Sequence, residues 1–250
     1  MGINKKFLQS AITGSSFNGV LNDTDPLDEG TDTLELFLDF NGNVDDSSGH
    51  NRSQIDRGGN FYTDNVHIRY PFSYRWIDIG YGLAAGRNLS FWFNLSTATA
   101  DREYCIYNNG WSSTSWTDIL FSTDYSAGSV FFNVNNMTGS SAYNYKRVDI
   151  SSDWNGFATW NFISVNIISG TTAEYSLNGS AFADIPTYSS LGTSGFQSNA
   201  PEFGRGFKSS GYYYGSAGYV TGNYDKARFF SKNLSDAEAL RLSQEIGIPF

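Results

Sequence analysis

Residues 34–40, with the sequence LELFLDF, place a large apolar side chain at every second position. This spacing is the period of a β-strand that buries one of its two faces. Residues 89–95, LSFWFNL, repeat the pattern. We expect further strands in the segments 104–107, 129–134, 161–168, 173–177 and 226–230. The chain is therefore predicted to be built mainly from strands.

Turn and cap signals add to this pattern. Asn178-Gly179 favours a two-residue hairpin turn, with residues 182–185 as the return strand. Near the C-terminal end, Ser235 and Glu238 have the spacing of a helix capping box. This is the one helix that the sequence indicates clearly.

Many strands, one short terminal helix and no alternation of strands with helices predict an all-β protein. The expected architecture is a two-sheet antiparallel sandwich of the jelly-roll type. One domain over residues 34–250 fits this pattern best. Residues 1–33 are rich in Ser, Gly, Asn and acidic side chains, and are interpreted as an N-terminal arm or linker and possible anchor. A free tail is the alternative to an arm that docks on a larger assembly.

The composition excludes several classes of partner. The chain of 250 residues carries a formal net charge of −9. Nucleic acid is not an expected partner, because a phosphate backbone needs a cationic surface. No apolar run is long enough to span a bilayer, and the first residues lack the apolar core of a secretion signal. We therefore expect neither nucleic-acid binding nor membrane insertion.

Side chains that support catalysis are sparse. A retaining glycoside hydrolase needs two carboxylates about 5–5.5 Å apart, but Glu35 and Asp39 have the wrong spacing for a glucanase strand. His50 and His67 lack a metal-ligand spacing. Cys105 is the only cysteine, so no disulfide forms within the chain. We expect a non-enzymatic protein with no catalytic residues and no required cofactor.

Five segments resemble, in the same order, motifs of the laminin G-like jelly rolls, which belong to the concanavalin A-like lectin and glucanase superfamily. They are residues 36–49, 89–93, 160–165, 175–179 and 224–238. The resemblance implies a concanavalin A-like sandwich with a closing C-terminal helix, of a kind found in phage structural proteins. In the last segment, Asp225 and Arg228 are three residues apart and are therefore expected on opposite faces of a strand.

Calcium is the one cofactor that this resemblance suggests, because some family members bind it at the edge of the sandwich. Asp45 and Asp46, with the serines that follow, offer the hard oxygen atoms that Ca²⁺ prefers. The alternative is that these carboxylates only stabilise a turn.

Candidate ligand-binding residues are aromatic side chains in stretches predicted to be loops, since a flat ring covers the apolar face of a sugar. They are Trp111, Trp116, Tyr212, Tyr213 and Tyr214. Protein contact, glycan binding and local packing all remain open for them. Trp92 and Trp160 fall in predicted strands and are expected to pack between or over the sheets.

The first functional hypothesis is a non-enzymatic structural module on the surface of a phage virion, either a capsid decoration or a tail or fibre component. Under it, residues 1–33 bind other virion proteins and the sandwich faces outward. The protein would then be made in the host cytoplasm. The alternative is a lectin-like module that recognises a host or environmental polysaccharide. A hydrolase ranks third, and fold alone does not decide among these functions.

Overall fold

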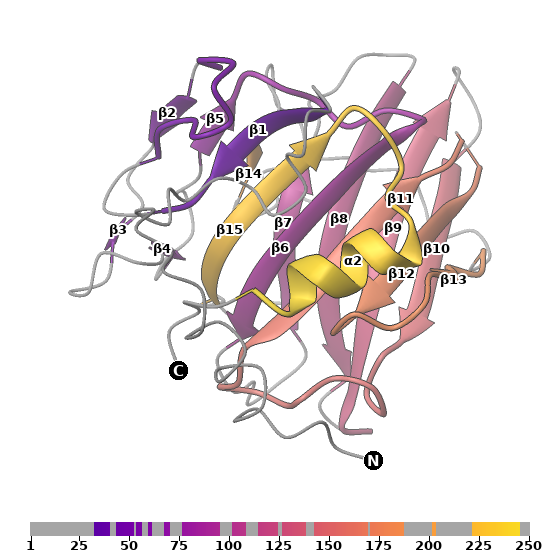
Figure 1. Ribbon diagram of the computed structural model, residues 1–250. Coiled ribbons are helices and arrows are strands. Elements are labelled where there is room, and N and C mark those ends of the chain that lie inside the picture. Colours follow the sequence, from indigo (N-terminus) through magenta and orange to yellow (C-terminus); the bar gives the residue numbers. More distant parts are fainter. Residues whose placement is uncertain are drawn as a thin grey trace, which may run out of the picture.

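The computed structural model describes residues 33–40, 44–52, 54–56, 60–61, 68–70, 77–95, 102–108, 115–124, 127–138, 143–169, 171–187, 202–203 and 222–245. Within these residues, two antiparallel β-sheets stack face to face beside one short helix, α2 (Asp236–Ser243) (Figure 1). The predicted all-β sandwich is confirmed. Residues 1–32 lie outside the described part, so the N-terminal arm stays a prediction.

The two sheets, called sheet A and sheet B, each combine strands from distant parts of the chain. Sheet A has the order β13 (Ala183–Asp184), β12 (Ala173–Leu177), β11 (Asn161–Ile167), β6 (Arg87–Leu95), β15 (Gly222–Phe230), β4 (Ile68–Tyr70) and β3 (Asn60–Phe61), with β1 (Leu34–Leu38) also paired to β15. Sheet B has the order β10 (Tyr143–Asp149), β9 (Ser129–Thr138), β8 (Ser115–Asp124), β7 (Arg102–Asn108), β14 (Glu202–Phe203), β5 (Ile77–Ile79) and β2 (Gln54–Asp56).

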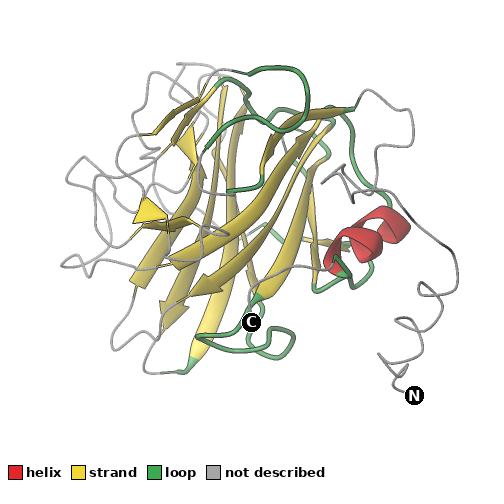
Figure 2. Cartoon of the chain, turned by 60° about the vertical axis from the view of Figure 1, so that its left-hand side comes forward, coloured by secondary structure: helices red, strands yellow, loops and turns green. Residues whose placement is uncertain are grey.

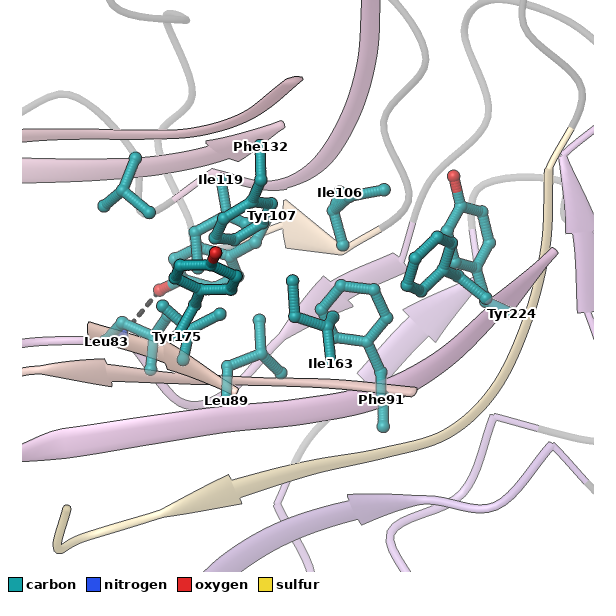
Figure 3. Packing of buried hydrophobic residues seen from close by; sticks show 14 of the residues in the cluster. Leu83, Leu89, Phe91, Ile106, Tyr107, Ile119, Phe132, Ile163, Tyr175 and Tyr224 are labelled. Atoms are coloured by element: carbon teal, nitrogen blue, oxygen red, sulfur yellow. Dashed lines mark hydrogen bonds between the residues drawn. The ribbon is translucent and has the colours of Figure 1, made fainter. Parts of the chain in front are cut away.

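The hydrophobic core fills the space between the sheets, and the alternation of the sequence explains how. In β6, the apolar residues Leu89, Phe91, Phe93 and Leu95 are all fully buried. The ring of Phe93 lies 4.4 Å, centroid to centroid, from that of Phe121 on sheet B. Figure 3 shows apolar side chains of both sheets meeting in this layer. Burying each large apolar side chain stabilises the fold by about 1.5–3 kcal/mol.

The outer face of sheet A is buried as well, which a simple alternating pattern does not indicate. All seven residues of β11 are buried. Asn88, Ser90, Ser164 and Asn166 form a connected set of side-chain hydrogen bonds on this face. The Asn166 amide also donates to the carbonyl of Leu234 and accepts from its N–H, both at 2.9 Å. These bonds fix the C-terminal segment to the sheet.

Helix α2 covers this outer face and lies to one side of the strands (Figure 2). The predicted capping box is confirmed: Ser235 Oγ accepts from the N–H of Glu238, and Glu238 Oε2 accepts from the N–H of Ser235 at 2.8 Å. The helix buries Ala239 and Leu242, and Leu242 joins an apolar cluster with Phe162 of β11.

One side of the sandwich is closed by residues 183–187. β13 pairs with β12 of sheet A, whereas Thr187 forms a bridge with Lys146 of β10 in sheet B. Lys146 is buried here, and its Nζ donates to the carbonyl of Ile185 at 3.2 Å. Burial lowers the pKa of the Lys146 amine, and the carboxylate of Asp184 offsets this in part.

Two tryptophans lie outside their predicted elements. The sequence predicts a loop at Trp116, but this residue belongs to β8 and pairs with Met137 of β9. Long-range pairing decides the structure here, and a local pattern does not report it. Trp160 immediately precedes β11 and is half-buried. Trp92 lies in β6 as expected, with its ring 5.5 Å from that of Phe162.

Candidate functional site

The outward side of sheet B provides the candidate site. In β9, Val130, Phe132 and Val134 are buried in the core, so the alternate residues Phe131 and Asn133 lie on the opposite side of the sheet. We call this side of β8, β9 and β10 the β8–β10 face. Its described side chains are Ser122, Asp124, Ser129, Phe131, Asn133, Arg147 and Asp149.

Two contacts organise the β8–β10 face. Cζ of Arg147 lies 3.5 Å from the ring centroid of Phe131, and both side chains are half-buried. Such a cation–π stack contributes about 0.5–1 kcal/mol at a partly exposed position. Beside it, the fully buried Asn133 amide donates to Ser122 Oγ at 3.0 Å. The face therefore presents a ring and a guanidinium beside a buried, hydrogen-bonded pair of polar side chains.

The strand register extends this face along the sheet. Trp116 pairs with Met137, and Met137 pairs with Tyr143. In the next row, Asn135 pairs with Tyr145. Residues two apart in a strand share a face, so the backbone places positions 116, 143 and 145 on the β8–β10 face. Only position 116 can be singled out from residue type in the sequence, because the other two require the register of β10.

Helix α2 lies against sheet A, with Leu242 in the apolar cluster that contains Phe162 of β11 (Figure 1). The other candidate ligand-binding residues, Trp111, Tyr212, Tyr213 and Tyr214, lie outside the described residues. Their role stays a prediction.

The predicted calcium residues lie in a tight turn after β1. Asp46 Oδ1 accepts from the N–H groups of Phe37 and Ser48, at 3.1 and 2.9 Å, and Oδ2 accepts from the N–H of Arg52 at 2.8 Å. Asp45 beside it is exposed. Both Asp46 oxygens are thus occupied by donors, which suits turn formation better than metal binding. Calcium binding stays a prediction.

A cluster of two arginines around a tyrosine has no counterpart in the sequence analysis. Tyr81 lies in the loop from β5 to β6, and Arg87 is the first residue of β6. Cζ of Arg52 and of Arg87 lie 5.3 and 4.6 Å from the Tyr81 ring centroid. Arg52 pairs with the carboxylate of Glu35, whereas the Arg87 guanidinium donates to the carbonyl of Gly82. Three separate segments contribute, so no sequence spacing signals the cluster.

The described residues hold no group of three or more His, Cys, Asp or Glu side chains placed to bind a metal ion. His50 is exposed, and His67 lies outside the described part. Among the helices that the structure describes, none is both long and apolar enough to cross a membrane.

No protein-family model and no curated protein sequence matches this chain. Solved structures do match it. The binding domain of botulinum neurotoxin serotype D aligns over 85% of this chain with a TM-score of 0.59 and 16% identity. The serotype D ligand-binding domain in complex with N-acetylneuraminic acid gives the same values. A type C structure, whose title states that cell entry depends on two ganglioside molecules, covers 85% with a TM-score of 0.58 and 15% identity.

The likeness establishes a shared fold. At such low identity it establishes nothing finer, and membership of the laminin G-like branch stays a prediction. The chain spans about half the length of these neighbours: 51%, 50% and 51% respectively.

Proposed function

We propose that this chain is a non-enzymatic carbohydrate-binding β-sandwich and that its saccharide lies on the β8–β10 face. The observation that carries the proposal is the Phe131–Arg147 stack beside the Asn133–Ser122 hydrogen bond on the β8–β10 face. The lectin-like alternative from the sequence thus becomes the leading function.

The chemistry of this face suits a sugar. A saccharide has an apolar C–H face and a rim of hydroxyl groups, so it needs a flat ring and polar side chains together. Phe131 and Arg147 are half-buried and therefore partly accessible. The ring covers the apolar face, while the guanidinium supplies several N–H donors to hydroxyl oxygens. The backbone positions 116, 143 and 145 extend the same face along the strands.

The structural neighbours support a carbohydrate ligand. Two of them are described with gangliosides and with N-acetylneuraminic acid, both of which contain sugar. Those ligands are named for proteins about twice as long as the matched region. The support is therefore for the class of ligand, and the site on this chain rests on its own side chains.

A protein partner is the second candidate for the same face, because aromatic and arginine side chains also dominate protein interfaces. A protein partner would accord with our further proposal that the protein lies on a virion surface and is anchored there by residues 1–33. Deleting residues 1–33 should leave a folded domain that no longer joins particles. Unchanged incorporation would contradict the anchor.

The test of glycan binding starts from a glycan array probed with the full chain, followed by calorimetry with the strongest hit. Phe131→Ala and Arg147→Ala should each weaken binding at least tenfold. The control is Leu240→Ala, at an exposed position on α2, which should bind as the unaltered chain does. Thermal unfolding checks that each variant is folded. An array without hits, or binding that neither variant weakens, would contradict the proposal.

A further inference from the structure

We propose that the Arg52–Tyr81–Arg87 cluster binds a small oxyanion, a carboxylate or sulfate group, through the guanidinium of Arg87. This site goes beyond the proposed function. The cluster joins the turn after β1 to the loop before β6, whereas the β8–β10 face lies at the other end of the sheet B strand order.

The charge of the cluster favours binding of an anion. Arg52 has a carboxylate partner in Glu35. Among the described residues, Arg87 contacts no carboxylate, and its guanidinium donates only to the carbonyl of Gly82. Arg87 is half-buried. A guanidinium offers five donors, and a partly buried cation is ordinarily paired with an anion. The cluster therefore has one positive charge in excess and donors to spare.

The hydroxyl of Tyr81 is buried and has no hydrogen-bond partner among the residues that the structure describes. Buried polar atoms nearly always have a partner, and each exception calls for an explanation. Burial raises the pKa of Tyr81, and Arg87 offsets this in part, so the neutral hydroxyl stays a donor. A bound oxyanion, or a water that accompanies it, supplies the missing acceptor.

Hydrogen bonds also hold the cluster in a fixed position. The N–H of Leu83 donates to the hydroxyl of Tyr107 at 2.6 Å (dashed in Figure 3), and the N–H of Gly86 donates to the carbonyl of Ile167 at 2.7 Å. The loop that carries Tyr81 is thus tied to both sheets. A preorganised site loses less conformational freedom when a ligand binds.

The ligand class follows from the donor. A planar guanidinium matches the paired oxygens of a carboxylate or a sulfate, and binds either through two parallel N–H bonds. Such a group occurs as a free anion or on an acidic saccharide, and the choice of probes separates these two sources.

The experiment is calorimetric and thermal titration of the full chain with acetate, glucuronate and sulfate, at an ionic strength held constant with chloride. At least one anion should bind and raise the unfolding temperature in proportion to its occupancy. Arg87→Gln should weaken that binding at least tenfold, while Arg241→Gln, which removes the same charge from α2, should not. Tighter binding of glucuronate than of acetate indicates that the ligand is an acidic saccharide. Equal affinity for the two indicates that it is the free anion.

A second variant distinguishes a loss of anion binding from a folding defect. Arg87→Lys keeps the charge but loses the planar fork, so it should bind less tightly than the unaltered chain and more tightly than Arg87→Gln. No anion-specific effect in the unaltered chain, or equal binding by all three proteins, would overturn the inference. Phe131→Ala should leave anion binding unchanged, and Arg87→Gln should leave neutral-glycan binding unchanged. Failure of this site is therefore distinguishable from failure of the proposed function.

Discussion

Asp225 and Arg228 lie on the same outer face of β15, although they are three positions apart in the sequence. Asp225 pairs with Trp92 and Arg228 pairs with Ser90, two residues that share the outer face of β6, and the register shifts between the two pairs. Lys226 has a φ of 49° at this bulge. The period of a regular strand predicts opposite faces for Asp225 and Arg228. That prediction is wrong because a bulge inserts a residue into one strand only.

The bulge builds a buried charge cluster. Glu245, just after α2, accepts from Arg228 Nη2 at 2.6 Å and from Lys226 Nζ at 3.2 Å. Asp225 is 1% exposed, and within the described part of the chain neither of its carboxyl oxygens has a hydrogen-bond partner. Burial raises the pKa of Asp225 to about 8, against the opposing effect of the Lys226 and Arg228 cations. Asp225 is therefore mainly protonated at neutral pH.

Asp225→Asn should make the protein more stable at alkaline pH. The folded-state pKa of Asp225 lies above its ordinary value of 3.8. Its contribution to stability is thus fully present below about pH 4 and is lost as the pH rises through about 8. The asparagine does not titrate, so its advantage should grow over that range to the order of a few kcal/mol. Urea unfolding at pH 5 and pH 9 measures this, and a pH-independent difference would contradict the buried, protonated carboxyl.

Glu245→Gln should destabilise the protein by about 2–3 kcal/mol at pH 7, because it leaves the fully buried Arg228 without its anion. Glu245 also raises the pKa of Asp225, so the variant should lower that pKa and let Asp225 take over part of the charge balance. Carbon-13 NMR titration of the carboxyl groups follows this. The control is Asp153→Asn at an exposed carboxylate. A variant as stable as that control would show that the buried pair has no net effect.

Gly179→Ala should loosen the packing of α2. Gly179 has a φ of +79°, and an added Cβ would collide with Ser243 Oγ and lie 3.0 Å from Leu240 Cδ1. We expect a loss of about 2–4 kcal/mol from backbone strain and displacement of the helix together. Gly128→Ala is the matched control, because Gly128 has a similar φ of +67° and open space around it. Equal losses in thermal unfolding would mean that the contact with α2 contributes nothing.

Ser235→Ala should cost about 1 kcal/mol, because it removes the side-chain acceptor of the capping box at the start of α2. The two hydrogen bonds between the Asn166 side-chain amide and the backbone of Leu234 remain, so the helix should stay in place. Hydrogen exchange should then show faster exchange confined to the first turn of α2. Loss of protection across the whole helix would indicate that the cap, rather than Asn166, fixes this segment.

Those parts of the fold that depend on local pattern could be predicted from the sequence. The apolar alternation at 34–40 and 89–95 predicts β1 and β6, and the Asn178-Gly179 pair predicts the turn after β12. The strands β8 and β10 could not be predicted in this way. They are defined by pairing with β9, and their own sequences lack a clear alternation of apolar and polar residues.

Much less of the candidate site could be predicted, because its contacts join distant segments. Trp116 was identified by residue type, but its position beside Met137 depends on the register of two strands. The Phe131–Arg147 stack depends on the pairing of β9 with β10. Residue type and the family resemblance suggest Asp46 as a calcium ligand, but neither reports the three backbone N–H bonds that its oxygens accept, which favour the alternative of a turn.

The most direct test of carbohydrate binding by the β8–β10 face is to map amide chemical shifts by NMR as the strongest array hit is titrated into the labelled chain. We predict that the largest changes occur at Ser122, Phe131, Asn133 and Arg147, with smaller changes in α2. Changes that are confined to other parts of the molecule, such as the 151–160 loop or the residues around Arg87, would contradict the account.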